Sequence, residues 1–117
     1  MARTAESSPT EDPPIDLIHL AKYTCGNAEL EQEVLSLFVD QLPALLSQLA
    51  TCATDKAWHD AAHTLKGSAR AVGARKLGDF AEAAEAAAPP QRQDAVDAIK
   101  SEIARVCGYV DFIVADA

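Results

Sequence analysis

The stretch "WHDAAHTLKGSARAVGARKLGDFAEAA", residues 58–84, decides the fold, because its apolar residues recur at three- and four-residue steps. This spacing places them on one side of an α-helix. The helix that contains the first part of this stretch is expected to begin at Thr54 or Asp55 and to end at Gly73. Its apolar side consists of Trp58, Ala61, Ala62, Leu65, Ala69 and Val72. A second set follows almost at once, formed by Leu77, Phe80, Ala81 and Ala84. So short a connection predicts that the two helices pack as antiparallel neighbours.

Helical spacing continues on both sides of this pair. Asp16 can cap a short helix that runs to about Thr24 and ends at Gly26, and Asn27 can cap the next helix. That next helix is interrupted by Pro43, which is expected to kink or locally break it without ending it. Its predicted buried stripe is Leu30, Val34, Phe38, Leu42, Leu45, Leu49 and Cys52.

The prolines at 89 and 90 mark a turn before the last helix. The last helix contains Gly108 and carries the stripe Val96, Ile99, Ile103, Val106, Val110 and Ile113.

We therefore predict an all-α protein that folds as an antiparallel up-down-up-down four-helix bundle with a short N-terminal helix. The bundle is expected to span residues 15–117. Residues 1–14 are polar, contain prolines and lack periodicity, so a disordered tail is expected there. Each long helix has one apolar stripe, which is enough for a closed bundle, and we expect a monomer.

Composition excludes several classes of function. The chain has 117 residues and a formal net charge of −8, which disfavours binding to nucleic acid or to an anionic membrane. No apolar run is long enough to span a bilayer, and the N-terminus does not resemble a signal peptide. The three cysteines are far apart and form no C-x-x-C pair. We expect a cytoplasmic protein.

The helix around residue 63 has a second, polar face. On a helical wheel, this face lies between about 80° and 180° from Trp58. It comprises Lys56, His59, His63, Lys66, Gly67 and Arg70. Residues 56–76 carry five cations and one anion, a balance of +4 in a chain of −8. This excess predicts a site for an acidic partner.

Three residues of this face predict a chemical site. An exposed imidazole such as His63 is largely neutral at pH 7, and its free ring nitrogen is a competent nucleophile. Lys66, three residues later, can reach an anion attached to the ring. Gly67 costs about 1 kcal/mol relative to alanine inside a helix. Because this helix uses alanine freely, the glycine suggests space for a large group that approaches His63.

Residues 62–85, "AHTLKGSARAVGARKLGDFAEAAE", closely resemble the signature of histidine-containing phosphotransfer (HPt) domains of two-component phosphorelays. The matching positions are His63, Leu65, Lys66, Gly67, Ser68, Gly73, Leu77 and the Ala84–Glu85 pair. The earlier "LFVDQLPALLSQL", with Phe38 and Pro43, resembles the family's second helix.

The resemblance implies that His63 accepts a phosphoryl group from a receiver-domain aspartate and passes it to another receiver. Lys66 would stabilise the phosphoryl oxygens, and Gly67 would leave room for the receiver. Ser68 would support the helix, and Glu85 would orient the imidazole. The partners would be response-regulator receiver domains and a hybrid or upstream histidine kinase. This chain would bind no cofactor, since the receiver would hold the Mg²⁺, and it is not expected to phosphorylate itself.

The sequence allows other interpretations. His59 and His63 have the spacing of a two-histidine metal site, but two histidines fall short of a zinc ligand set, and no metal is expected. A purely structural scaffold would leave Lys66 and Gly67 unexplained. A bundle that binds receivers to sequester them, or that drains phosphoryl groups, would share the same motif. His59 is outside the family motif and is either a plain exposed residue or one that tunes His63 or contacts the partner, as Lys56 and Arg70 would.

Overall fold

The computed structural model describes residues 13–115, and its ordered elements are all helical within that range. The predicted tail, residues 1–14, and the last two residues of the predicted bundle lie outside it, apart from the prolines at 13 and 14. The elements are α1 (Leu17–Thr24), α2 (Ala28–Ala50), α3 (Asp55–Val72), α4 (Arg75–Glu85), the short 3₁₀-helix η1 (Pro89–Gln91) and α5 (Arg92–Ala115). The prediction of one short and four longer α-helices is confirmed for this part of the chain.

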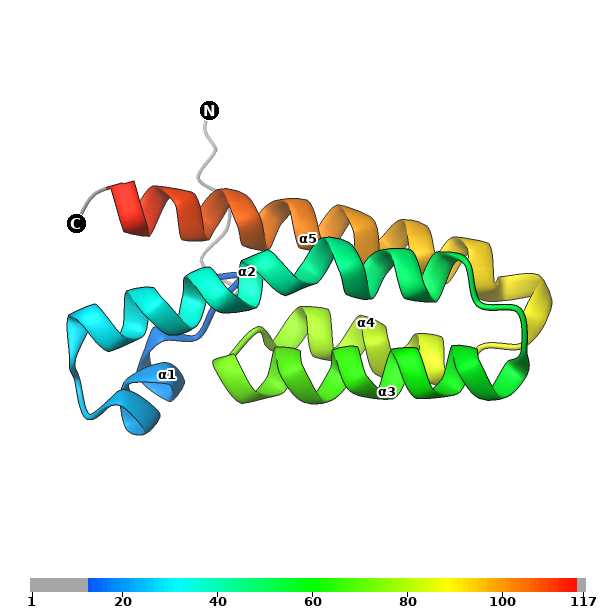
Figure 1. Cartoon of the computed structure of the whole chain (residues 1–117), viewed down its shortest axis with the longest axis horizontal. Helices are drawn as coiled ribbons and strands as arrows, with labels where there is room; N and C mark the ends of the chain where they lie inside the picture. Colours follow the sequence, from blue (N-terminus) through cyan, green and yellow to red (C-terminus); the bar gives the residue numbers. More distant parts are fainter. Residues whose placement is uncertain (1–12, 116–117) are drawn as a thin grey trace, which may run out of the picture.

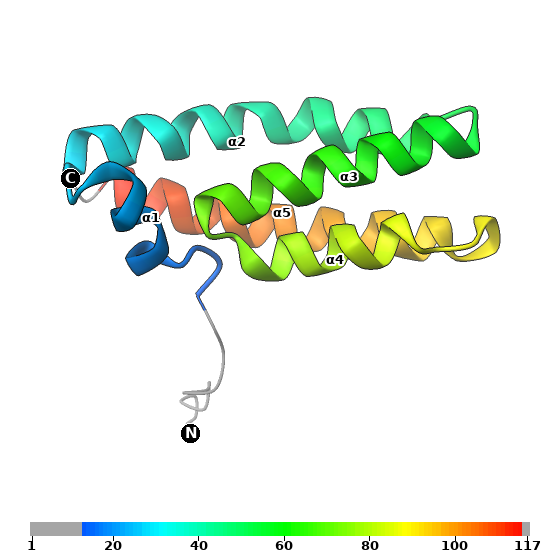
Figure 2. The same cartoon turned by 90° about the horizontal axis from the view of Figure 1, so that it is seen from below.

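The four longer helices lie side by side (Figure 1). α2 packs against α3 and α5, and α4 likewise packs against α3 and α5, so the four helices enclose one core. The short helix α1 lies at one end, where it contacts α2 and α3 (Figure 2). A helical bundle is therefore the observed architecture.

The predicted helix ends agree with the observed ones. The side chains of Asp16, Asn27 and Thr54 each accept a hydrogen bond from the backbone N–H three residues later, at 3.0 to 3.1 Å. Each therefore satisfies one of the backbone donors that the first turn of a helix leaves unpaired. Pro43 lies inside α2 without ending it, as expected.

Gly73 does more than end α3. Its φ of 89° is the left-handed conformation that favours glycine. Its carbonyl oxygen accepts a hydrogen bond of 2.8 Å from the backbone N–H of Asp16, and a Cβ at Gly73 would lie 2.8 Å from the Asp16 carbonyl oxygen. The side chain of Asp16 also pairs with Arg75. The glycine therefore lets the segment before α1 dock on the α3–α4 turn.

The residues buried in the core are mostly those of the predicted stripes, but the stripe predicted for α2 is partly wrong. Leu42 is fully buried, whereas Leu30 is 40% exposed, so the prediction for Leu30 is wrong. Successive four-residue steps drift by about 40° each, which puts Leu30 about 120° from Leu42. Leu35 lies only about 20° from Leu42 on the same wheel and is buried, although the predicted stripe omitted it. Some other predicted positions are only partly buried: Val34, Leu45, Cys52, Phe80 and Ile113.

None of the helices within residues 13–115 combines the length and the hydrophobicity that a bilayer span requires.

Candidate functional site

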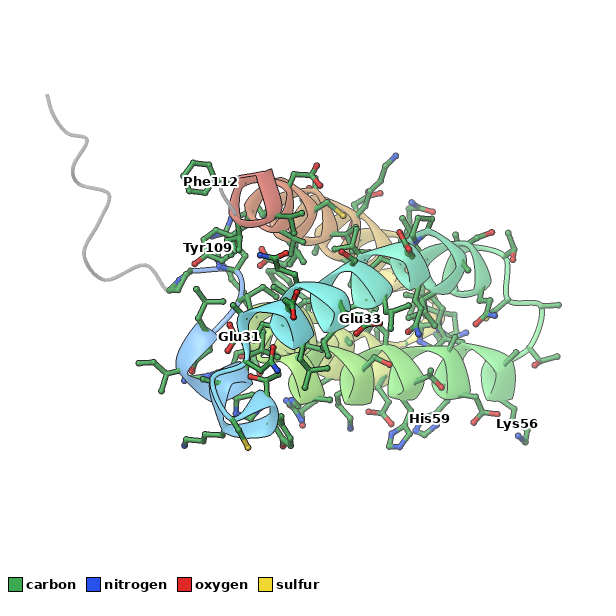
Figure 3. All side chains as sticks on the ribbon, turned by 60° about the vertical axis from the view of Figure 1, so that its left-hand side comes forward. Glu31, Glu33, Lys56, His59, Tyr109 and Phe112 are labelled. Carbon is green, nitrogen blue, oxygen red and sulfur yellow. The ribbon has the colours of Figure 1, made fainter. Side chains whose placement is uncertain are left out.

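Helix α3 separates a packing side from an exposed side. Its six predicted core residues, from Trp58 to Val72, are all buried. The opposite side presents His59, His63 and Gly67 to solvent. Figure 3 shows Lys56 and His59 projecting from α3 away from the bundle. The part of the predicted face that carries these residues is thus an exposed surface of the molecule.

His63 is held by a carboxylate from the neighbouring helix. Its side chain is 66% exposed, and its Nδ1 lies 3.2 Å from Oε2 of Glu85, the last residue of α4. An ionised carboxylate only accepts hydrogen bonds, so in a neutral ring Nδ1 carries the proton. The lone pair is then on Nε2. The contact with Glu85 therefore selects the tautomer in which Nε2 is the unprotonated nitrogen.

Glu85 connects three side chains of α3. Its side chain is only 14% exposed, and its Oε1 accepts a hydrogen bond of 2.7 Å from Nζ of Lys66. Its Oε2, which contacts His63, also lies 3.0 Å from Nε2 of His59. The hydrogen bond from Lys66 lowers the pKa of Glu85, and the one from His63 adds to this, against partial desolvation, which raises it. Glu85 is therefore ionised at neutral pH and balances the charge of Lys66.

His59 belongs to the same cluster as His63. The two rings are parallel within 6°, and their centroids are 6.3 Å apart. Nδ1 of His59 lies 4.0 Å from Oδ1 of Asp60, whose Oδ2 accepts a 2.7 Å hydrogen bond from Lys56. That bond lowers the pKa of Asp60 and raises the pKa of Lys56. His59 thus has a carboxylate near each ring nitrogen.

Gly67 and Ser68 follow His63 by one helical turn. A Cβ built on Gly67 meets nothing within 4 Å, so the fold itself does not require a glycine at this position. Ser68 is partly buried. The surface beside His63 is consequently bare of side-chain atoms at Gly67.

Arg70 lies across α4 and not in free solvent. Its Nη2 donates to Glu82 at 2.7 Å and to Asp79 at 3.2 Å, and these carboxylates raise its pKa. A Cβ on Gly78 would come within 2.8 Å of Cγ of Arg70, so Gly78 gives the arginine its path. Together with the pairs formed by Lys56 and Lys66, these contacts balance much of the positive charge counted along α3. The expected excess of positive charge on this face is therefore offset by carboxylates, most of which α4 supplies.

Sequence reasoning missed the contact that positions Glu85. The indole Nε1–H of Trp58, placed only in the core by its spacing, donates a buried 2.7 Å hydrogen bond to the carbonyl oxygen of Ala84. This bond ties α3 to α4 one residue before the carboxylate. The signal for the whole arrangement was the three-residue spacing of Asp79, Glu82 and Glu85, opposite the cations of α3.

The described part of the chain contains no group of three or more His, Cys, Asp and Glu side chains arranged to hold a metal ion. Its three cysteines are free thiols.

Comparison with known proteins gives one family. The family model of the Hpt domain matches residues 33–109, which include all of α3 and α4 and every residue of the site. No curated protein and no solved structure matches the chain. Hpt domains take part in phosphotransfer in two-component signalling, in which they interact with receiver domains and kinases. Because the matched region covers more than half of its length, the chain belongs to the Hpt domain family.

Proposed function

We propose that the protein relays a phosphoryl group between receiver-domain aspartates through a phosphohistidine at His63. The observation that carries the proposal is the 3.2 Å contact between Nδ1 of His63 and Oε2 of Glu85. It leaves Nε2 as the nitrogen with the lone pair, on a side chain that is 66% exposed. A nucleophile that must meet another protein's active site has to be exposed in this way.

The transfer is a displacement at phosphorus. The lone pair of Nε2 forms the N–P bond while the bond from phosphorus to the aspartyl oxygen breaks, and that electron pair stays on the aspartate carboxylate. His63 thereby becomes a phosphoimidazolium that retains its Nδ1–H. The Glu85 carboxylate, already in contact with Nδ1, stabilises this positive charge. Transfer to a second receiver is the reverse step with another aspartate.

Lys66 supplies the counter-charge for the phosphoryl group. Its Nζ is held by Glu85 in the resting protein, and its side chain is 20% exposed. One helical turn separates it from His63, so Nζ can move to a phosphoryl oxygen when that group arrives. The ion pair with Glu85 keeps the ammonium close to where it is needed, which reduces the reorganisation at the moment of transfer.

The residues around this centre receive the partner. Gly67 leaves room for the receiver's active site beside the imidazole, and Ser68 supports the helix beneath it. Lys56, His59 and Arg70 line the surface that the receiver contacts. The Mg²⁺ of the reaction is held by the receiver.

The wider setting belongs to the same proposal. A hybrid or upstream histidine kinase supplies the phosphoryl group, and the protein acts as a cytoplasmic monomer. The four long helices run in antiparallel up-down-up-down order, an arrangement supported by the two residues, Gly73 and Ala74, that connect α3 to α4.

A labelled phosphoryl group tests the relay. A receiver carrying ³²P on its aspartate is mixed with the wild-type protein, with His63→Gln and with Lys66→Ala. We expect acid-labile label on the wild type, none on His63→Gln and slower labelling of Lys66→Ala with unchanged helix content. Acid-stable label, or label that persists in His63→Gln, would refute the proposal. Loss of the fold in Lys66→Ala would show that this lysine is structural.

A further inference from the structure

We propose that His59 takes up a proton when His63 becomes phosphorylated, so that the phosphorylation equilibrium of His63 depends on pH through a second histidine. This inference rests on the proposed phosphorylation of His63. It assigns a positioning and charge-balancing role to a residue that lies outside the sequence motif of the site.

The surroundings of His59 suit an imidazolium. Nε2 lies 3.0 Å from Oε2 of Glu85, so the neutral ring keeps its proton on Nε2 and its lone pair on Nδ1. Nδ1 lies 4.0 Å from Oδ1 of Asp60. The second proton would therefore be bound from solvent at Nδ1, where a carboxylate already faces it. The Oδ2 oxygen of Asp60 accepts a hydrogen bond from the ammonium of Lys56.

In the resting protein, the two carboxylates nearest to His59 are each already paired with a lysine. Glu85 is balanced by Lys66, which donates to its Oε1 at 2.7 Å. Lys56 balances Asp60 in the same way. Neither carboxylate therefore carries an unbalanced negative charge next to His59 in the resting protein.

Phosphorylation changes this balance in a known direction. The phosphoryl group brings a charge of about −2 and the ring of His63 becomes positive, a net change of about −1. The change occurs on a ring whose centroid is 6.3 Å from that of His59. When Lys66 moves to the phosphoryl oxygens, Glu85 also loses its ammonium partner while remaining next to His59. Both effects favour the imidazolium form of His59.

Linkage makes the effect reciprocal. If phosphorylation favours proton binding at His59, a proton on His59 favours phosphorylation by the same factor. We expect a factor of about five, the lower end of typical coupling between sites, because both rings are largely exposed. Compared with a protein that lacks His59, acidification between about pH 8 and about pH 6, where histidines titrate, should then shift phosphoryl groups toward His63. Protonation of unphosphorylated His63 opposes this shift, but it does so equally in variants that alter only His59.

The test compares the wild type with His59→Gln, which cannot titrate, and with His19→Gln as a matched control. His19 lies on α1, where its ring contacts Tyr23. Each protein is equilibrated with a ³²P-labelled receiver at about pH 6 and at about pH 8. The amount of label on His63 at the lower pH is then divided by the amount at the higher pH. We expect this ratio to be about fivefold lower in His59→Gln than in the wild type and in His19→Gln. Equal ratios in all three proteins would overturn the inference.

Two further outcomes separate the possible failures. A His59→Gln protein that takes less label by the same factor at both pH values would show a structural role and would also overturn the inference. NMR of the ring Cε1–H group of His59 provides a direct measurement, and we expect a larger protonated fraction at pH 7 in the phosphorylated protein. If the wild type takes no label on His63 at all, the proposed function fails. Label on His63 with no change at His59 defeats only this inference.

Discussion

Gly67→Ala should make the protein more stable and less active. A Cβ on Gly67 meets nothing within 4 Å, so the folded bundle accepts the methyl group without strain. Alanine inside a helix is about 1 kcal/mol more favourable than glycine. For a domain of this size, that gain corresponds to a rise in Tm of about 4 °C.

The same methyl group lies on the surface that a receiver must approach. Forcing a methylene-sized group into a close contact costs about 1 to 3 kcal/mol, which slows a reaction by roughly 5- to 150-fold. Phosphoryl transfer from a labelled receiver, followed in single-turnover experiments, measures this effect. Thermal unfolding followed by circular dichroism measures the stability.

Gly108→Ala is the matched control for this variant. Gly108 is also exposed and lies inside α5, and a Cβ added there would meet nothing within 4 Å. The substitution should give a similar rise in Tm with an unchanged rate of transfer. If Gly67→Ala transfers phosphoryl groups as fast as the wild type, the reasoning that Gly67 clears space for the receiver is wrong.

Three other substitutions test the supports of the site. Gly73→Ala should destabilise the protein by more than about 1 to 2 kcal/mol in urea unfolding, because φ is 89° and the new Cβ would meet the segment before α1. An unchanged free energy of unfolding would contradict the docking of that segment on the α3–α4 turn. Trp58→Phe should cost about 1 to 3 kcal/mol, since the Ala84 carbonyl oxygen loses its 2.7 Å donor, and a cost near zero would show that water replaces it. Glu85→Gln should lower Tm at neutral pH. The hydrogen bond from Lys66 depresses the pKa of Glu85 below its ordinary 4.5, so the stabilisation is present above that value and is lost as the pH falls through the lowered pKa. The Tm difference between the wild type and Glu85→Gln should therefore vanish in acid, and a constant difference would refute this origin.

The helices were predictable because their apolar spacing and their caps are local properties of the chain. The error at Leu30 shows the limit of that reasoning. Four-residue steps look periodic, but each step rotates the side chain by about 40°, and only the packing against neighbouring helices fixes which direction is inward. Leu35, about 20° from Leu42 on the same wheel, was the buried residue.

The site residues on α3 were predictable from the sequence, and the family resemblance implied that Glu85 would orient the imidazole, whereas the other contacts of the site were not foreseen. His63, Lys66 and Gly67 could be placed on one face from the sequence alone. The partners of these side chains come from α4, 19 to 22 residues later, and their contacts depend on how the two helices are rotated about their axes. The contact between His59 and Glu85 has the same origin. For this reason, the charge counted along α3 overstated how basic the surface is.

The proposed relay requires a phosphoryl group on the imidazole of His63. Mass spectrometry of the protein after incubation with a phosphorylated receiver, with fragmentation that preserves the N–P bond, tests it most directly. We predict one phosphoryl group on the peptide that contains His63, lost on brief acid treatment and absent from His63→Gln. A phosphoryl group on any other residue, or none on the wild type beside a receiver that transfers to another phosphotransfer protein, would contradict it.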